Sequence, residues 1–552
     1  MTVFAAVDLE AGGLTGLDYF VIGLYLVGMM GMGLRIAFRQ KSADDFFVGG
    51  RNLPAWAVGI SLFASLLSTI TFLGMPGEMF RTGIAFLTRQ LPIPLVLAVV
   101  WFLWIPFFMK LNLTSAYEYL EKRFSYPVRA AAAIFCLMLL FGWISVVVLT
   151  ASNAMAQITN LQLGWYEDAE IHILILSVGM FSILYTTMGG IRAVIWTDVI
   201  QFFVLLAGSL FTMGAIAWMT NSGISDWLAV ASNYQHEKVE WFDTDVRNRS
   251  TVFSISLSMF FWYICTHGAN QVALQRYFTV KDAKAARRSY LVSAVASIAV
   301  GVILAGVGMS LMYFIQTHEL PATANLSSTV TTTRNIAQDA IFPQFIRYYL
   351  PSGLRGMVVA ALFAAAMSTI DSGANSASTI VTVDFFRRFR KGPIDSHAEL
   401  RRARILTASS GVVVVAYTVL LYHFSKGTDI ITLCQKGFNC FLGPLGAVFV
   451  LAMFSKRATT TTVLPAFLLG EAVGVGTSYS QELFGIAFST HLVIAASWLA
   501  TIIISHVLAI VLRTRATDEQ QQWMWLPVIR SPRKDNFVTH DINQPAAQAR
   551  EQ

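Results

Sequence analysis

The chain has 552 residues, of which 55% are hydrophobic and 13% charged, with a mean hydropathy of +0.59 and a formal net charge of +7. A soluble protein of this size needs many more charged side chains to cover its surface, so this class is excluded. Residues 1–17 hold Asp8 and Glu10 but no Lys or Arg, so we expect no secretory signal peptide there.

Apolar segments of about 20 residues, the length that crosses a bilayer as a helix, recur along the whole chain. They predict an all-α polytopic membrane protein with about 13 transmembrane helices and no separate soluble domain. The predicted spans are 16–36, 54–75, 90–109, 129–157, 171–188, 194–219, 252–275, 289–315, 354–383, 404–423, 430–454, 461–480 and 488–512.

An odd number of spans places the two termini on opposite sides of the membrane. With the N-terminus outside, 29 of the 39 Lys and Arg residues fall in cytoplasmic segments, as the positive-inside rule requires. We therefore expect a plasma-membrane protein with an outside N-terminus and a cytoplasmic C-terminus. The positive net charge then reflects topology and does not indicate a nucleic-acid partner.

The regions between and after the spans complete the predicted organisation. Two long outer loops are expected at 220–251 and 316–353, the second rich in Ser, Thr and Asn (325–328) and suited to cap an entrance. The polar tail from residue 513 onward contains three prolines and is expected to be poorly ordered.

The second predicted span carries five hydroxyl side chains near the membrane centre: Ser61, Ser65, Ser68, Thr69 and Thr71. A single hydroxyl of this kind commonly bonds a carbonyl of the preceding helical turn or packs at a small-residue interface. The cluster, flanked by Gly59 and Gly74, instead favours an interrupted helix whose freed carbonyls face a polar cavity.

The seventh predicted span is the second anomaly, because it reads Trp-Tyr-Ile-Cys-Thr-His-Gly-Ala-Asn-Gln over 262–271. Polar groups buried in the bilayer without partners are costly, so this run predicts a cavity or a polar partner. Spans two and seven are the first helices of two five-span sets that begin in opposite directions. Corresponding broken helices in inverted repeats indicate a transport site at the membrane midplane.

Span nine contains adjacent hydroxyls, Ser368 and Thr369, followed by the intramembrane acid Asp371. Asp198, near the start of span six, is either a helix N-cap or a carboxylate close to those hydroxyls. Carbonyls, hydroxyls and a carboxylate are oxygen ligands that suit a hard cation such as sodium. Lys436, in span eleven, either extends to the outer interface or meets an anionic substrate.

With these residues in view, the chain resembles the sodium/solute symporter family over about residues 15–515. Its members carry glucose, proline, sialic acid, iodide, monocarboxylates or vitamins. The resemblance rests on the Asp-Phe-Phe-Val-Gly-Gly-Arg-Asn-Leu-Pro run at 45–54, on Gly-Gly-Ile-Arg-Ala-Val-Ile-Trp-Thr-Asp at 189–198, on Asn270-Gln271 and Gln275-Arg276, and on Ser368-Thr369.

The resemblance implies an inverted five-plus-five helix repeat with two broken helices and alternating access. It divides the chain into an N-terminal part (1–53), a first repeat (54–219), an outer loop (220–251), a second repeat (252–454), two peripheral helices (455–512) and a cytoplasmic tail (513–552).

The same resemblance implies a sodium site and a neighbouring substrate site. The implied sodium ligands are the backbone carbonyls of Ala64, Leu67 and Ala365 and the hydroxyls of Ser368 and Thr369, with Asp198 as an acid that binds or admits sodium. Ser68, Thr71, Phe86 and Gln90 match bacterial sialic acid symporters, and Gln435 matches a position that contacts sugar. The aromatic and hydroxyl residues Trp143, Tyr263 and Thr266 complete the predicted substrate-binding set.

Two positions depart from the sialic acid symporters. Trp143 stands where those proteins have an arginine for the carboxylate, and Ala365 stands where they have a serine that assists a second sodium. These departures argue against sialic acid itself and leave one or two sodium ions per cycle.

The predicted function is sodium-coupled symport of a small polar solute (a sugar, a sialic acid-like compound or a monocarboxylate) by alternating access. The cargo is sodium and the solute, in contact with the lipid bilayer. The alternatives are a proton-coupled or uncoupled carrier, in which Asp198 or Asp371 titrates, and a transporter-like sensor. An enzyme is not predicted, because the chain has no H-E-x-x-H helix or G-x-S-x-G elbow.

Overall fold

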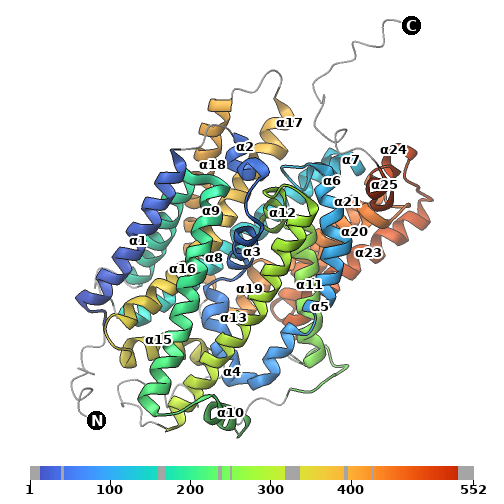
Figure 1. Cartoon of the computed structure of the whole chain (residues 1–552). Coiled ribbons are helices and arrows are strands. Elements are labelled where there is room, and N and C mark those ends of the chain that lie inside the picture. The colour runs from blue at the N-terminus through green and yellow to red at the C-terminus, as the bar shows by residue number, and fades with distance from the viewer. Residues whose placement is uncertain are drawn as a thin grey trace, which may run out of the picture.

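The computed structural model describes residues 13–38, 43–159, 161, 168–233, 239–248, 251–317, 336–390, 396–425, 428 and 430–531. Within these ranges the chain is a bundle of helices without strands, apart from an isolated bridge between Glu240 and Thr251. Figure 1 shows the long helices running side by side. Residues 1–12, the predicted loop segment 325–328 and the tail beyond 531 lie outside the described residues.

The helices follow one another in the order α1 (Gly16–Ala37), α2 (Ala43–Val48), α3 (Ala55–Leu66), α4 (Thr69–Thr82), α5 (Ile93–Val99), α6 (Ile105–Leu111), α7 (Glu118–Arg123), α8 (Tyr126–Thr159), α9 (Ala169–Thr220), α10 (Ile224–Asn233), α11 (Val252–Ala269), α12 (Gln271–Phe278), α13 (Ala283–Thr317), α15 (Ile336–Tyr349), α16 (Leu354–Ile380), α17 (Arg387–Phe389), α18 (Ser396–Phe424), α19 (Ile430–Gly437), α20 (Leu442–Phe454), α21 (Thr460–Ser478), α22 (Ser480–Phe484), α23 (Val493–Val511), α24 (Asp518–Gln521) and α25 (Trp525–Arg530). Shorter turns include 3-10 segments at Gly49–Arg51, Gly83–Gln90, Asn439–Phe441 and Thr490–Leu492, and π-helical segments at Val100–Trp104 and Val381–Phe386.

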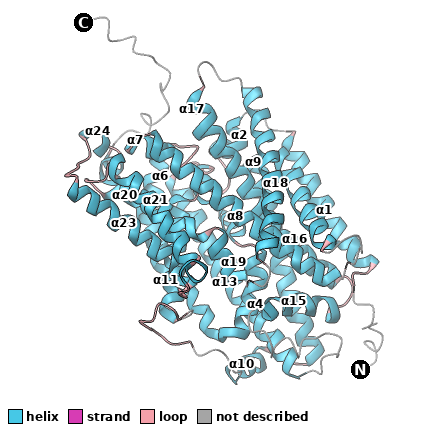
Figure 2. Ribbon diagram, turned by 180° about the vertical axis from the view of Figure 1, so that it is seen from behind, coloured by secondary structure: helices cyan, strands magenta, loops and turns pink. Residues whose placement is uncertain are grey.

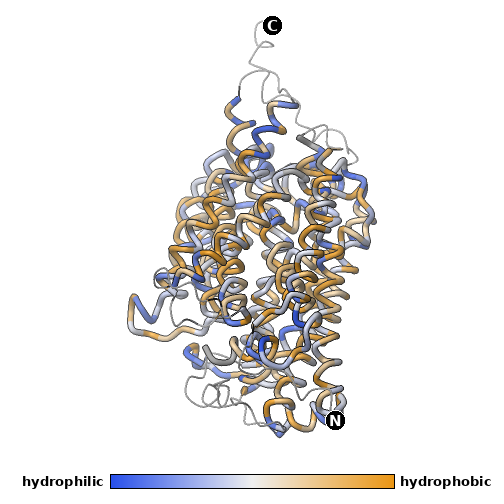
Figure 3. Tube along the Cα trace, turned by 90° about the vertical axis from the view of Figure 1, so that its left-hand side faces the viewer, coloured by the Kyte–Doolittle hydropathy of each residue, from blue (hydrophilic) through white to orange (hydrophobic). Residues whose placement is uncertain are grey.

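The outer faces of these helices are apolar, as a bilayer requires. On α1, for example, Phe20, Leu24 and Val27 are each more than 60% exposed. Figure 3 shows hydrophobic residues along the helices and hydrophilic ones gathered toward the two ends. Among the described residues, nine helical stretches are long and apolar enough to span a membrane, and three shorter apolar helices accompany them. All thirteen predicted segments are helical, while their number as membrane crossings stays a prediction.

Both predicted breaks are present. Between α3 and α4, Leu67 and Ser68 have extended backbones, with φ/ψ of −91°/115° and −118°/177°. Between α11 and α12, Asn270 is extended, and its side chain accepts a hydrogen bond from the Val272 amide over 2.9 Å. This is the arrangement of an N-cap, which satisfies a donor that the second half-helix leaves free.

The helices contain two further irregularities. The first lies in α9, where predicted spans five and six meet at a kink at Gly190, whose φ is 54° and ψ is −167°. That conformation strongly favours glycine. A third interruption follows α19, where Phe438 leaves helical geometry before α20. Here a Cβ atom on Gly142 of α8 would lie 2.1 Å from the Gly437 carbonyl oxygen, so α8 passes very close to this break.

The short helices gather at the two ends of the bundle. In Figures 1 and 2, α2, α7, α17 and α24 lie at one end, whereas α10 and α15 lie at the opposite end. The first group comes from segments predicted to be cytoplasmic, and the second comes from the predicted outer loops. Which end faces the cytoplasm stays a prediction.

The described part of the tail corrects the expectation of poor order. Residues 518–530 form α24 and α25. The Trp525 indole N–H donates to the Leu103 carbonyl over 2.9 Å, and the Lys110 ammonium donates to the Ser531 carbonyl over 3.1 Å. Val528 is fully buried. The prediction of poor order rested on the prolines of the tail. The apolar side chains Trp525 and Val528 instead pack on the bundle next to α6 and order this part of the tail.

The helix α16 forms the centre of the bundle. The stretch Leu354–Phe389 is 89% buried over its most apolar window, the highest share among the candidate spans in the described residues. Its many alanines, serines and glycines permit close approach of neighbouring helices. A Cβ atom on Gly373, for instance, would lie 2.5 Å from Ile144 of α8. This close packing fixes the position of the hydroxyl groups of α16 against α3.

Candidate functional site

The first break places backbone carbonyls of α3 opposite hydroxyl groups of α16. The Ser368 hydroxyl donates to the Ala64 carbonyl over 3.0 Å and to the Ala365 carbonyl over 3.3 Å. The Thr369 hydroxyl donates to the Ser65 carbonyl over 3.3 Å. Carbonyls in the last turn of a helix lack intrahelical partners, which leaves them available to side chains or to a cation.

The residues predicted as sodium ligands therefore meet at this break. Four of them (Ala64, Ala365, Ser368 and Thr369) supply the oxygens just described. Leu67 follows α3 directly as the first extended residue, and its amide donates to the Phe63 carbonyl over 2.9 Å. All are neutral oxygen donors, the kind that a hard monovalent cation prefers. The residues present thus fit sodium.

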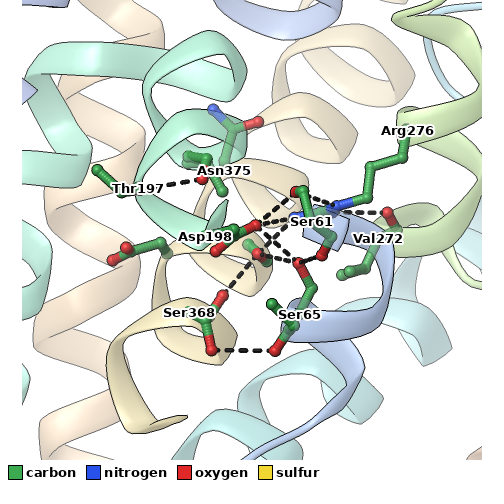
Figure 4. Close-up of polar contacts among 12 residues, drawn as sticks. Ser61, Ser65, Thr197, Asp198, Val272, Arg276, Ser368 and Asn375 are labelled. Atoms are coloured by element: carbon green, nitrogen blue, oxygen red, sulfur yellow. Dashed lines mark hydrogen bonds and ion pairs between the residues drawn. The ribbon is translucent and has the colours of Figure 1, made fainter. Parts of the chain in front are cut away.

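A dense polar cluster lies beside this break, around Asp198 of α9 (Figure 4). The Ser61 hydroxyl donates to the Asp198 carboxylate over 2.5 Å, and the Ser65 hydroxyl lies 3.1 Å from the same oxygen. The Ser372 hydroxyl of α16 donates to the Ser65 hydroxyl over 2.8 Å. All four side chains are buried. The cluster therefore joins α3, α9 and α16 through hydrogen bonds.

Arg276 of α12 completes the cluster. Its guanidinium forms an ion pair with Asp198 at 3.1 Å, and both side chains are fully buried. It also donates to the Ser61 hydroxyl over 3.0 Å, to Ser372 over 2.6 Å and to the Val272 carbonyl over 2.8 Å. The half-helix that follows the second break is in this way connected to the half-helix that precedes the first.

Of the two interpretations of Asp198, the helix N-cap is wrong, because Asp198 lies well inside α9. The interpretation as a carboxylate near the hydroxyls of span nine agrees with its connection to Ser372. Its partner Arg276 was not predicted, although it directly follows predicted span seven and belongs to the Gln275-Arg276 motif that carried the resemblance. One buried carboxylate oxygen, Asp198 Oδ1, has no hydrogen-bond partner among the described residues.

A cavity of about 190 Å³ lies next to the first break. Its described lining includes seven of the eight residues predicted to bind substrate: Ser68, Thr71, Phe86, Gln90, Trp143, Tyr263 and Gln435. The eighth, Thr266, is buried outside this lining, and its carbonyl accepts the Asn270 amide over 3.2 Å as the last turn of α11. Ser68 borders the cavity directly after Leu67, so the same break faces both predicted sites.

Several residues of the cavity were missed by the sequence analysis. They are Arg89, His267, Tyr290 and Asn439, which also line it. The His267 ring nitrogen is 2.9 Å from the Tyr277 hydroxyl. Arg89 immediately precedes Gln90 and sits at the boundary of a predicted span, where a basic residue is ordinary. Asn439 follows the third break, which the sequence analysis did not expect.

The two charged side chains whose roles were left open, Lys436 and Asp371, both have polar partners. Lys436 forms an ion pair with the half-exposed Glu482, and its ammonium lies 5.5 Å from the Tyr479 ring centroid. It is not among the lining residues of the cavity. Asp371 accepts a hydrogen bond from the Thr186 hydroxyl of α9, and both are buried.

The chain is similar in sequence and in fold to known proteins. The sequence pattern of the Sodium:solute symporter family matches residues 46–470, which is most of the chain. The chain belongs to this family. The resemblance stated from the motifs is thereby confirmed, and a sodium:solute symporter is a transporter and not an enzyme.

Among curated relatives, the sodium/sialic acid symporter NanT of Aliivibrio fischeri is 32% identical over 83% of this chain and 86% of its own length. The symporter SiaT of Proteus mirabilis is 29% identical over 87% of this chain and 94% of its own. The human sodium/iodide cotransporter is 28% identical over 85% of this chain and 70% of its own.

The solved structures show the same fold. A Na+-coupled sialic acid symporter in a substrate-bound, outward-open state superposes with a TM-score of 0.76 at 26% identity, over 90% of this chain and 98% of that one. The transporter Mhp1 superposes with a TM-score of 0.57 at 12% identity, over 87% of this chain and 97% of that one, and supports the fold alone. The chain is thus a multi-pass membrane symporter with sodium as its coupling ion, and the predicted fold class is confirmed.

Proposed function

We propose that this protein imports a small polar organic solute across the plasma membrane, coupled to sodium, by alternating access. Sodium binds the carbonyls of Ala64, Leu67 and Ala365 and the hydroxyls of Ser368 and Thr369. The solute binds in the adjacent cavity. The N-terminus faces outward and the C-terminus faces the cytoplasm.

The observation that carries this proposal is the contact between α16 and the broken end of α3. The Ser368 hydroxyl reaches the Ala64 carbonyl over 3.0 Å, three residues before Leu67 and four before the cavity residue Ser68. A cation at this point fixes the extended residues that form one wall of the cavity. Sodium and solute therefore each raise the affinity for the other by the same factor.

The membrane potential supplies part of the driving force. Moving one positive charge inward through 100 mV releases about 2.3 kcal/mol, to which the sodium gradient adds. Asp198 accepts a hydrogen bond from Ser65 and is not among the described lining residues of the cavity, and its Oδ1 atom has no hydrogen-bond partner in the described part of the chain. We assign it the role of attracting sodium along its path and keep it outside the first ligand set.

The positions of the residues predicted to bind the solute suggest what each contributes. Ser68, Thr71, Gln90 and Gln435 provide hydrogen bonds to the solute. Phe86, Trp143 and Tyr263 form apolar walls, and the Trp143 and Phe438 rings lie 6.1 Å apart across the third break. Thr266 supports the second break through its carbonyl and does not contact the solute.

Uptake into proteoliposomes tests the proposal. Wild type is measured with and without an inward sodium gradient against sugars, sialic acid, small carboxylates, proline and iodide. Thr369→Ala removes a proposed ligand, and Thr418→Ala is its matched control, because Thr418 is a buried threonine of α18 whose hydroxyl, in the described part of the chain, donates to the Val414 carbonyl of its own helix. We expect sodium-dependent accumulation of one solute in wild type and in Thr418→Ala, and its loss in Thr369→Ala.

Uptake that ignores sodium but follows pH would contradict the proposal and favour the proton-coupled alternative. Binding of a solute without any accumulation inside the vesicles would favour the sensor.

A further inference from the structure

Arg89 occupies an unusual position for a positively charged side chain. It lies on the 3-10 segment Gly83–Gln90 between the first broken helix and α5, and it lines the cavity. Its guanidinium carbon lies 5.0 Å from the Phe86 ring centroid. Its described hydrogen bonding is limited to a long contact, 3.9 Å, with the Met259 sulfur. None of its five N–H donors reaches an oxygen acceptor in the described residues.

Other arginines in the bundle have oxygen partners. Arg129 pairs with the Asp384 carboxylate at 2.7 Å, and Arg276 pairs with Asp198. The fully buried Arg123 donates to two backbone carbonyls, at 2.9 and 2.7 Å. Glu78 interacts favourably with Arg89 through space but forms no described ion pair with it. A guanidinium that faces a cavity without a protein acceptor is available to bind an anion there.

The charges of the residues that line the cavity also indicate an anionic ligand. Arg89 is the one Lys or Arg among the described lining residues, and no Asp or Glu is found among them. The two nearby candidates are engaged elsewhere, because Lys436 pairs with Glu482 and Arg276 pairs with Asp198. The cavity therefore has a net positive charge and one group placed to neutralise an anionic solute.

The remaining polar groups of the cavity describe the rest of the solute. Three lining amides, those of Gln90, Gln435 and Asn439, each have a buried side-chain oxygen without a hydrogen-bond partner in the described part of the chain. Gly301 leaves room for the Gln90 side chain, because a Cβ atom at Gly301 would lie 2.0 Å from the Gln90 amide nitrogen. Unpartnered amide oxygens require hydrogen-bond donors, which hydroxyl or N–H groups of a solute supply.

We propose that the transported solute is a hydroxylated carboxylate and that the Arg89 guanidinium binds its carboxylate group, while the three amides bind its hydroxyl groups. This inference rests on the proposed function, because it takes the cavity as the solute site. Arg89 would then bind the carboxylate, which Trp143 cannot do because an indole has neither a charge nor a second donor. The inference also narrows the predicted solutes from sugars and acids in general to acids.

The test uses pairs of probes that differ in the carboxylate. Purified full-length protein in saturating sodium is titrated with gluconate against glucitol, and with lactate against propane-1,2-diol. Binding is followed by tryptophan fluorescence, because Trp143 and Trp262 line the cavity. We expect wild type to bind at least one carboxylate about 100-fold more tightly than its uncharged partner, the range for a desolvated charge pair.

Arg89→Gln is expected to abolish this preference, whereas Arg89→Lys retains part of it because an ammonium keeps the charge without the planar fork. Lys436→Gln is the matched control, since it removes a positive charge outside the cavity, and it is expected to leave the preference unchanged. Equal affinity for the members of both pairs in wild type, absence of binding by either carboxylate, or an unchanged preference in Arg89→Gln would each overturn the inference.

A separate readout distinguishes failure of the inference from failure of the proposed function. Sodium alone, without solute, is expected to raise the thermal unfolding midpoint of wild type and of Arg89→Gln equally, and to have no effect on Thr369→Ala. Sodium stabilisation with no carboxylate preference overturns the role of Arg89 alone. Loss of sodium stabilisation in wild type overturns the proposed function itself.

Discussion

The Asp198 cluster and the cavity lie on either side of the same helix break, yet they treat polar groups in opposite ways. In the cluster, Ser61, Ser65, Ser372 and Arg276 bond to one another and to Asp198, and they join four helices. In the cavity, three amide oxygens have no partner among the described residues, and the Arg89 guanidinium reaches no oxygen there. In the cluster, Asp198 Oδ1 is the one described side-chain atom without a partner, and the other groups hold the helices together, whereas the cavity leaves four polar groups for a ligand.

The largest expected effect comes from breaking the cluster. Arg276→Gln leaves the Asp198 carboxylate buried without its cation, which costs about 3–5 kcal/mol of folding free energy. The double variant Asp198→Asn, Arg276→Gln removes both charges and is expected to recover most of the lost stability. Thermal unfolding in detergent measures both. A single variant as stable as wild type would show that the ion pair does not hold the helices.

The second largest effect is expected at the helix break that lies between the Asp198 cluster and the cavity. Thr369→Ala removes one oxygen at the break but leaves the cluster and the cavity intact. We expect the half-saturating sodium concentration for uptake to rise about 100-fold, beyond the range that drives accumulation, because the ion loses one contact to an oxygen ligand. Sodium titrations of uptake measure this. An unchanged sodium dependence alongside Thr418→Ala would place the ion elsewhere.

A smaller effect is expected from the cavity side. A Cβ atom at Gly301 would meet the Gln90 amide, which is the movable end of a flexible side chain. Gly301→Ala should therefore weaken solute binding by about tenfold with little change in stability, through one displaced hydrogen bond. Gly214→Ala is the matched control, because nothing lies within 4 Å of its added Cβ atom. If both variants bind solute alike, Gln90 does not contact it.

The smallest effect is expected at the ion pair outside both regions. Lys436 holds the pKa of Glu482 below its ordinary value by donating a hydrogen bond to it. A lowered carboxyl pKa means that this contribution is present above about pH 4.3 and is lost as the pH falls. Because Glu482 is half-exposed, Glu482→Gln should change the free energy of unfolding at pH 7 by less than about 1 kcal/mol and leave uptake unchanged. A large loss of uptake would give Lys436 a role in transport.

Much of the fold could be predicted because the bilayer constrains sequence strongly. Thirteen apolar segments and two polar interruptions follow from the cost of exposing backbone groups in lipid. The third break could not be found in this way. Gly437 and Phe438 stand in an apolar run that reads as one continuous helix, and the neighbouring Lys436 was interpreted only through its charge. The tail was misjudged because Trp525 and Val528 show their docking surface only in the folded structure.

The parts of the site formed by residues close together in the sequence were predicted. The parts formed by residues far apart in the sequence were missed. The hydroxyls of α3 and the Ser368-Thr369 pair were visible as local patterns, and the family resemblance supplied most cavity residues. Arg276 and Asp198 are 78 residues apart, so no local pattern connects them. Arg89 resembles an ordinary boundary residue until the structure places it in a cavity whose described lining contains no Asp or Glu.

The central claim is that one helix break joins the sodium site to the solute site. The most direct test is to measure both binding equilibria on the same purified protein: solute affinity with and without saturating sodium, and sodium affinity with and without saturating solute. The account predicts that each ligand raises the affinity for the other by the same factor, at least about fivefold. Solute affinity that is independent of sodium would contradict it.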